Sequence, residues 1–194
     1  MFKRAPVSFT LAVLCMLLAG TGEPTASALA WDRVAILHGE LWRLWTGHVV
    51  HFSASHAGVD ALVVASMGMA AEPLAGSRRF SQLLGAGALL ISLGLLVLVP
   101  GLQEYRGASG LAVLSAVLGG QLAWKRYRGS RQLLACAALA LAGKTFWEAF
   151  ASTAGFVELP AGVSVAWQAH VLGALVGGCV AAALYAPQAQ DNRG

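Results

Sequence analysis

The chain has 194 residues, of which 57% are hydrophobic and only 11% are charged, and its mean hydropathy is +0.66. Soluble domains carry about a quarter charged residues, so this chain lacks the polar surface of a water-soluble globule. Its net charge of +4 would suit nucleic acid in a soluble protein. Here the basic residues lie in short segments between apolar runs, so they indicate membrane topology, and we expect no nucleic-acid partner.

Six apolar runs follow one another along the chain, each near the length of about 20 residues that a helix needs to cross a bilayer. They are too long and too regular in hydrophobicity for barrel strands, and in lipid only helices or closed barrels satisfy their backbone groups. The isolated cysteines predict neither a disulfide nor a metal site, and we expect no cofactor. We predict an all-α bundle of six transmembrane helices, a single membrane domain over 1–194, with spans at about 8–22, 50–71, 83–100, 106–124, 131–150 and 162–185.

The distribution of Lys and Arg predicts that both termini are cytoplasmic. Lys144 lies inside a span and is left out of this comparison. The opposite side of the membrane receives only Arg33, Arg43 and Arg106. The cytoplasmic side receives Lys3, Arg4, Arg78, Arg79, Lys125, Arg126, Arg128, Arg131 and Arg193.

The first run has a second interpretation, as a signal peptide that is removed. A basic start, a short apolar core and the Ala-x-Ala pattern in "PTASALA" are typical of such a peptide. The loop that follows the run favours a retained helix, for a reason given below.

Ionisable residues inside a span cost at least a few kcal/mol without a partner, so they indicate a functional site. The second run, "HVVHFSASHAGVDALVV", contains His51, His56 and Asp60. His56 and Asp60 are four residues apart and therefore share one helix face.

A serine and a histidine lie near the outer ends of two parallel runs. Ser109 stands about one turn inside the fourth run, and His170 about two turns inside the sixth. Gly173 and Gly177 follow His170 on the same face, where small residues let another helix approach closely. A serine within about 3 Å of a histidine forms a nucleophile and its general base, which needs no third acid if a hydrogen bond and packing orient the imidazole.

Each of the two residues also has a plain structural interpretation. A serine in an apolar helix is more often a packing residue that bonds back to a helix carbonyl. A lone histidine often makes only an interhelical hydrogen bond. A catalytic role is favoured because Ser109 and His170 are both expected at the same membrane face, near the second run with its histidines.

Three motifs, in the right order over nearly the whole chain, resemble those of the rhomboid family of intramembrane serine proteases. "GASG" is similar to the family's Gly-x-Ser-Gly, and "AHVLGALVG" to its Ala-His-x-x-Gly-x-x-x-Gly. "ELWRLWTGHVVHFSASH" is similar to its Trp-Arg loop and to the histidine run that enters its second helix.

The resemblance implies that Ser109 is the nucleophile and His170 the general base. It implies that His56 and the Ser109 N–H stabilise the oxyanion, and it places Gly107 and Gly110 beside them in the motif. Asp60 stands where rhomboids usually have an asparagine that donates to the oxyanion, and an ionised aspartate would repel that charge. Asp60 is then either protonated or holds His56 by its other ring nitrogen, and the helical spacing favours the second role.

Two further features bear on the site, the Trp-Arg pair and the residue at position 113. Trp42 and Arg43 resemble the residues that brace the half-submerged first loop, which the first helix anchors in the family, so we expect that helix to be retained. Val113 stands where many rhomboids have a tyrosine that stacks on the catalytic histidine. We expect Trp147 or Trp167 to pack on His170 instead.

The small size, Asp60 and the segment "GKTFWEAF" resemble the rhombosortase subgroup. Lys144 and Glu148 in that segment are four residues apart, which predicts an intramembrane pair, or simply a snorkelling lysine with a neutralising partner. The resemblance implies that substrates enter past this span, so the two residues are alternatively a candidate substrate gate. The resemblance implies single-pass substrates with a C-terminal Gly-Gly tail, cleaved in the bacterial inner membrane by a site that opens to the periplasm.

Three alternatives to that function follow from the sequence. The first is a general rhomboid protease for other single-pass substrates, and the second is an inactive rhomboid-like protein that binds transmembrane helices. The presence of both Ser109 and His170 counts against the second. The third is a small transporter, which would need opposed half-helices or internal repeats that the sequence does not display. No oligomeric state is predicted.

Overall fold

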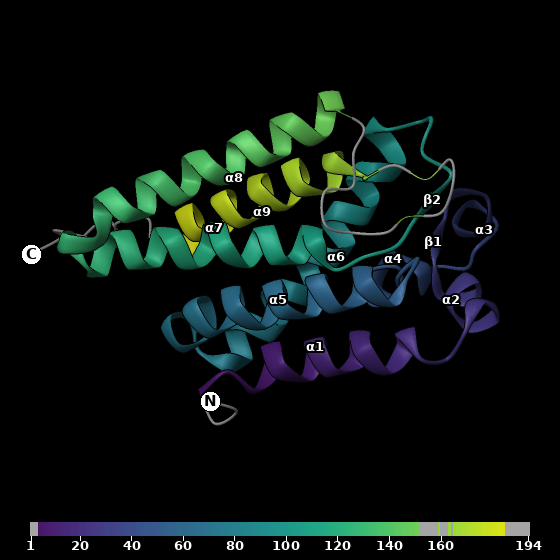
Figure 1. Ribbon diagram of the computed structural model, residues 1–194, viewed down its shortest axis with the longest axis horizontal. Coiled ribbons are helices and arrows are strands. Elements are labelled where there is room, and N and C mark those ends of the chain that lie inside the picture. Colours follow the sequence, from purple (N-terminus) through teal and green to yellow (C-terminus); the bar gives the residue numbers. More distant parts are fainter. Residues whose placement is uncertain (1–3, 152–158, 160–162, 164, 185–194) are drawn as a thin grey trace, which may run out of the picture.

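The computed structural model describes residues 4–151, 159, 163 and 165–184. In this part of the chain, six long helices run side by side, and short helices and a two-stranded ribbon lie at one end of the bundle (Figure 1). The long helices are α1 (Pro6–Ala19), α5 (Ala54–Ala75), α6 (Ser77–Leu98), α7 (Ser109–Arg126), α8 (Arg131–Ala151) and α9 (Trp167–Leu184). The short elements at that end are α2 (Glu23–Leu29), β1 (Trp31–Asp32), α3 (Arg33–Leu37), α4 (Arg43–Thr46) and β2 (Glu104–Tyr105), whereas the 3₁₀ helix η2 (Arg128–Ser130) connects α7 to α8 at the opposite end.

Each long helix overlaps one of the six predicted runs, and most ends differ by a few residues. Three helical segments are long and apolar enough to cross a membrane, namely α5, α6 and the segment Arg128–Phe150, which covers η2 and nearly all of α8. α1 and α9 are shorter apolar helices, and α7 ends in Lys125 and Arg126. The count of six spans therefore remains a prediction. Residues 162, 164 and 185 of the last predicted run, with Lys3 and Arg193 of the topology argument, lie outside the described residues.

Local sequence signals explain where the helix next to the site begins and ends. The Ser53 side chain accepts a hydrogen bond from the His56 N–H at 3.1 Å and so caps the first turn of α5. α5 ends at Ala75 and is followed by the cap residue Gly76, whose φ of +82° suits glycine. The next helix, α6, begins at the following residue, so α5 and α6 are joined by a very short turn.

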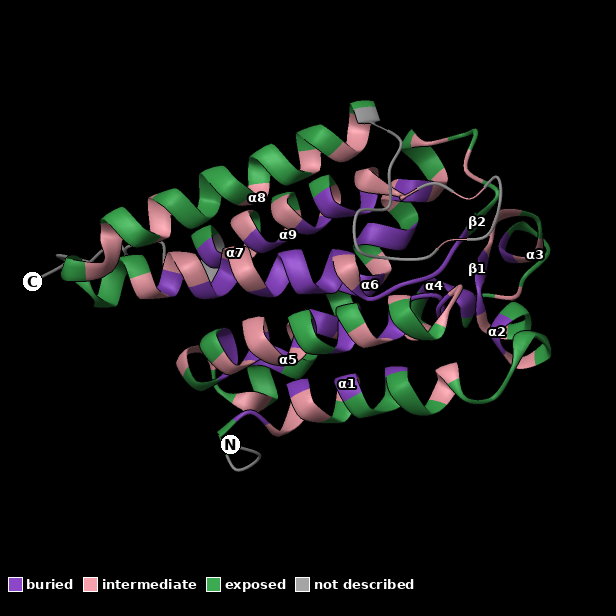
Figure 2. Cartoon of the chain, in the orientation of Figure 1, coloured by how far each residue is buried: buried purple, intermediate pink, exposed green. Residues whose placement is uncertain are grey.

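Helix α7 lies at the centre of the bundle, between α5 on one side and α9 on the other (Figure 1). Its middle is buried, whereas much of α8 is exposed (Figure 2). Large side chains such as Leu139 and Phe150 on α8 point away from the protein. This is the arrangement expected for a helix bundle whose outer faces contact lipid rather than water.

Helix α1 is tied to α5 by a buried carboxylate. Glu72 of α5 accepts hydrogen bonds from the N–H groups of Val7 and Ser8 at 3.1 and 3.0 Å and from the Ser8 hydroxyl at 2.7 Å. Gly68, one turn earlier on α5, lies directly against Ser8, so that a side chain there would overlap the serine. Glu72 thus satisfies the first backbone donors of α1, which have no acceptor within the helix.

Two arginines order the segment between α1 and α5. The Arg43 Nη1 donates to the carbonyls of Ser27 and Ala30 at 2.8 and 2.7 Å, and its Nε donates to Glu40. Arg33 donates to four carbonyls at the end of α6 and just beyond it, those of Leu95, Leu96, Val99 and Leu102. Trp42, the other residue of the Trp-Arg pair, is 51% exposed.

Candidate active site

The loop before Ser109 is held from several sides. β1 and β2 form an antiparallel ribbon in which Trp31 pairs with Tyr105. The Tyr105 hydroxyl donates to the Gly107 carbonyl at 2.6 Å, and the Gly107 N–H donates to the Gly47 carbonyl at 3.0 Å. The Arg106 guanidinium binds Glu23 on α2. Ser109, the first residue of α7, therefore begins its helix from a fixed position.

Gly107 has a φ of +135°, a backbone conformation that favours glycine. A Cβ at this position would lie 3.0 Å from both Asp60 Oδ2 and His56 Nε2. The first glycine of "GASG" is thus required both for the chain direction and for the close approach of α5.

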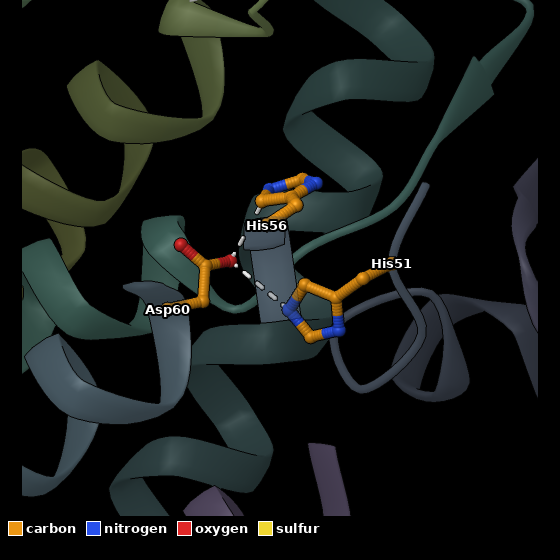
Figure 3. Close-up of side chains that lie close together, drawn as sticks. All are labelled: His51, His56 and Asp60. Carbon is orange, nitrogen blue, oxygen red and sulfur yellow. Dashed lines mark hydrogen bonds and ion pairs between the residues drawn. The ribbon is translucent and has the colours of Figure 1, made fainter. Parts of the chain in front are cut away.

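Asp60 on α5 is the centre of a hydrogen-bond network beside this loop (Figure 3). Its Oδ2 accepts the Ala108 N–H at 2.7 Å and lies 3.1 Å from His51 Nε2 and 3.5 Å from His56 Nε2. The contact with His56 has the helical spacing that the sequence predicts. The contacts with Ala108 and His51 join α5 to the loop before Ser109 and to the segment before α5.

The contacts with Asp60 indicate which ring nitrogens of His51 and His56 carry protons. A carboxylate only accepts hydrogen bonds, so His51 and His56 present Nε2–H to Asp60. The Nδ1 atoms of both rings are buried and have no hydrogen-bond partner within the described structure. The ligand atoms of His51, His56 and Asp60 lie within 4.8 Å of one another, and a divalent transition metal accepts such a donor set. Asp60 Oδ2 already accepts hydrogen bonds from Ala108 and His51, so an ion would have to compete with these donors for it.

Helices α7 and α9 approach each other to backbone contact at the level of Ser109 and His170. A Cβ on Gly173 would overlap the Gly110 carbonyl oxygen, and a Cβ on Gly177 would lie 2.7 Å from the Leu114 carbonyl oxygen. The direct neighbours of the two candidate catalytic residues also touch, since a Cβ on Gly110 would lie 3.1 Å from the Ala169 carbonyl oxygen.

His170 itself is only 4% exposed, and its ring has a partner that the sequence did not predict. The Nδ1 atom lies 2.9 Å from Glu148 Oε2 on α8. The other carboxylate oxygen of Glu148 binds the ammonium of Lys144, so the predicted pair is present. No hydrogen bond joins the Ser109 hydroxyl to His170 in the part of the chain that the structure describes.

That Trp147 or Trp167 packs on His170 stays a prediction. Trp147 is 65% exposed, and the described side chain that engages the imidazole is Glu148. Val113 is buried in the bundle. In the sequence, Glu148 stands out only as an acidic residue in an apolar run. Its helical spacing predicted Lys144 as its partner and gave no indication of His170.

Burial and ion pairing shift the pKa values of several groups in the loops at this end of the bundle. Burial raises the pKa of the Tyr105 phenol and lowers the pKa of His48 to about 4. The Glu23 carboxylate raises the pKa of Arg106, and Arg106 in turn lowers that of Glu23. The loops therefore keep His48 neutral and the Arg106–Glu23 pair charged at neutral pH.

Comparison with known proteins assigns the family. A search of curated proteins gives no match. A family model described as the Rhomboid domain matches residues 38–187, which is most of the chain and includes every candidate site residue. Together with its apolar helices, this match makes the chain a multi-pass membrane protein. The chain belongs to the rhomboid family, which consists mainly of intramembrane serine proteases.

Proposed function

We propose that the protein is an intramembrane serine endopeptidase in which Ser109 is the nucleophile and His170 the general base. The observation that carries this proposal is the close contact of α7 with α9 through Gly110, Ala169 and Gly173, directly beside both residues. Membrane helices that touch at backbone distance hold their side chains in a fixed relation. We expect the serine–histidine hydrogen bond to form in the substrate complex, since catalytic hydrogen bonds often tighten only there.

The chemistry is that of acyl transfer. The Ser109 hydroxyl proton passes to His170 Nε2 while Oγ forms a bond to the scissile carbonyl carbon. Collapse of the tetrahedral intermediate breaks the peptide bond, and the proton on Nε2 goes to the leaving amine. Water then attacks the acyl-enzyme with His170 again as base, which releases the second product and restores Ser109.

The oxyanion is stabilised by the Ser109 N–H and by His56. The Ser109 amide is one of the first of α7 and has no acceptor inside its helix. His56 directs Nε2 toward Asp60, so it donates to the oxyanion through Nδ1, and it does so as an imidazolium. Asp60 does not donate. It holds the Ala108 amide and balances the charge of His56.

We propose substrates with a single transmembrane helix that ends in a Gly-Gly sorting tail. Such a helix must unwind to expose its scissile carbonyl, and a glycine pair lowers the cost by about 1 kcal/mol per residue relative to alanine. The substrate enters beside α8, the most exposed long helix of the described bundle. The protein lies in the bacterial inner membrane with cytoplasmic termini, and its site opens to the periplasm. The retained first helix, the six spans and the roles of Trp42 and Arg43 as loop anchors belong to the same proposal.

The test is cleavage of a reconstituted model substrate whose tail carries Gly-Gly, beside the same substrate with Leu-Leu. We expect cleavage of the Gly-Gly substrate, loss of it in Ser109→Ala and His170→Ala, and retention in Ser115→Ala. Ser115 is a matched control because its hydroxyl bonds back to the Leu111 carbonyl at 2.8 Å. Equal cleavage of both substrates would favour a general rhomboid protease. No cleavage of either by folded protein would favour an inactive helix-binding protein.

A further inference from the structure

We infer that Glu148 completes the catalytic group as a positioning residue that fixes the tautomer and the orientation of His170. The inference rests on the proposed protease function and adds a third member to its serine–histidine pair. The interaction joins two helices: Oε2 of Glu148 on α8 lies 2.9 Å from Nδ1 of His170 on α9. The two side chains are 10% and 4% exposed, so the bond is shielded from water.

The chemistry of the two groups determines the proton positions. An ionised carboxylate has no hydrogen to donate, so the bond requires a proton on His170 Nδ1. The neutral imidazole then has its lone pair on Nε2, the nitrogen that must take the proton of Ser109. Without Glu148 the ring is free to adopt the other tautomer, in which Nε2 carries a hydrogen and is useless as a base.

Glu148 also stabilises the cation that forms during the reaction. When Nε2 takes the serine proton, the imidazole gains a positive charge in a site of low dielectric constant. The carboxylate at Nδ1 balances that charge without itself taking a proton. General acid–base groups of this kind contribute about 100-fold or more to a rate, and the contribution depends on their orientation.

Lys144 explains how a carboxylate is maintained at this depth. Its ammonium binds Oε1, which leaves Oε2 for the histidine. The Lys144 side chain is 60% exposed, and pairing with it alone would neutralise Glu148. The additional bond to a buried histidine on another helix is therefore not needed to balance charge, and it lies where the general base is expected.

The test compares Glu148→Gln and Glu148→Asp with the wild type in the Gly-Gly cleavage assay. Thr145→Ala is the local control, because Thr145 lies on the same helix and its hydroxyl donates to the Leu141 carbonyl at 3.0 Å. We expect Glu148→Gln to lower kcat about tenfold or more with KM changed less than about twofold. Glu148→Asp keeps the charge one methylene shorter and recovers part of the rate. Thr145→Ala retains the wild-type rate.

A second measurement does not depend on activity. Ring-¹⁵N-histidine spectra report which nitrogen carries the proton, and the His170 signals are identified by their loss in His170→Gln. We expect an Nδ1–H imidazole in the wild type and a loss of that preference in Glu148→Gln. A wild-type kcat and an unchanged tautomer in Glu148→Gln would overturn the inference. Cleavage that persists in Ser109→Ala would instead overturn the proposed function, while the spectra still test the bond.

Discussion

The carboxylate of Asp60 on α5 accepts the backbone N–H of Ala108 at 2.7 Å, directly before Ser109. This bond, rather than a side-chain donor to the oxyanion, is what the structure offers at the position where rhomboids usually have an asparagine. One acidic residue thereby links α5, the loop before α7 and the two histidines His51 and His56.

Replacement of Asp60 tests that link. We expect Asp60→Ala to lower the cleavage rate about tenfold or more and to lower the thermal midpoint, because a buried amide left without an acceptor costs about 1–3 kcal/mol. Asp60→Asn keeps an oxygen for the Ala108 N–H, so it retains more activity than Asp60→Ala. Initial rates and melting curves in detergent check both variants. A fully active Asp60→Ala would show that the bond to Ala108 has no part in holding Ser109.

Gly107→Ala tests the close approach of the loop before Ser109 to α5. The new Cβ would lie 3.0 Å from Asp60 Oδ2 and would force an L side chain into a positive φ. Such strain costs about 1–3 kcal/mol, so we expect a displaced Ser109 and a large loss of cleavage. Gly101→Ala is the control in the same loop, since nothing lies within 4 Å of its Cβ position. Equal rates in the two variants would contradict the geometry described for Gly107.

Gly173→Ala tests the contact that brings α7 and α9 together. Its Cβ would overlap the Gly110 carbonyl oxygen, so the two helices must separate, and overpacking of this kind costs about 1–3 kcal/mol. We expect the variant to insert in the membrane but to lose most of its cleavage activity. Gly178→Ala is the matched control for Gly173→Ala, because its Cβ would lie 3.5 Å from Gln121 Nε2, an ordinary van der Waals contact. The idea fails if Gly173→Ala is as active as Gly178→Ala.

His48 predicts how the stability depends on pH. Burial lowers the pKa of His48 from 6.5 to about 4, while its Nε2 lies 3.1 Å from the Ala88 carbonyl. Because the folded pKa lies below the unfolded one, the unfolded chain binds more protons between about pH 6.5 and 4, and folding weakens as the pH falls through that window. At pH 5 the free energy of unfolding is about 2 kcal/mol lower than at neutral pH because of His48.

The measurement is the fall in thermal midpoint between pH 7 and pH 5. We expect a smaller fall in His48→Gln than in the wild type. The control, His38→Gln, changes an exposed histidine and should behave as the wild type does. If His48→Gln shows the same acid sensitivity as the wild type, His48 is not the group that titrates.

The sequence predicted contacts within one helix and missed several of those between helices. His56–Asp60 and Lys144–Glu148 follow from a spacing of four residues, which fixes neighbours on any α-helix. The bonds from Glu148 to His170 and from Asp60 to Ala108 depend on how α8 and α5 are rotated and tilted against α9 and α7. Packing sets those angles, so an apolar run with one acidic residue does not indicate which neighbour that residue meets.

The helix positions were predictable for a similar reason. Long apolar runs determine where a chain becomes helical in lipid, and each of the six runs overlaps a helix of the described structure. The ends were less predictable, because they depend on caps such as Ser53 and on turns such as Gly76. The segments that form the short elements between α1 and α5 contain no long apolar run, so the sequence predicted them only as a loop.

The most direct test of the central claim is whether Ser109 is an activated nucleophile. Purified protein in detergent is treated with a fluorophosphonate probe for serine hydrolases, beside Ser109→Ala, His170→Ala and Ser115→Ala. We predict labelling of the wild type and of Ser115→Ala, and none of the variants that lack Ser109 or His170. Labelling that persists without either residue, or a folded wild type that does not react, would contradict the assignment of Ser109 and His170 as nucleophile and base.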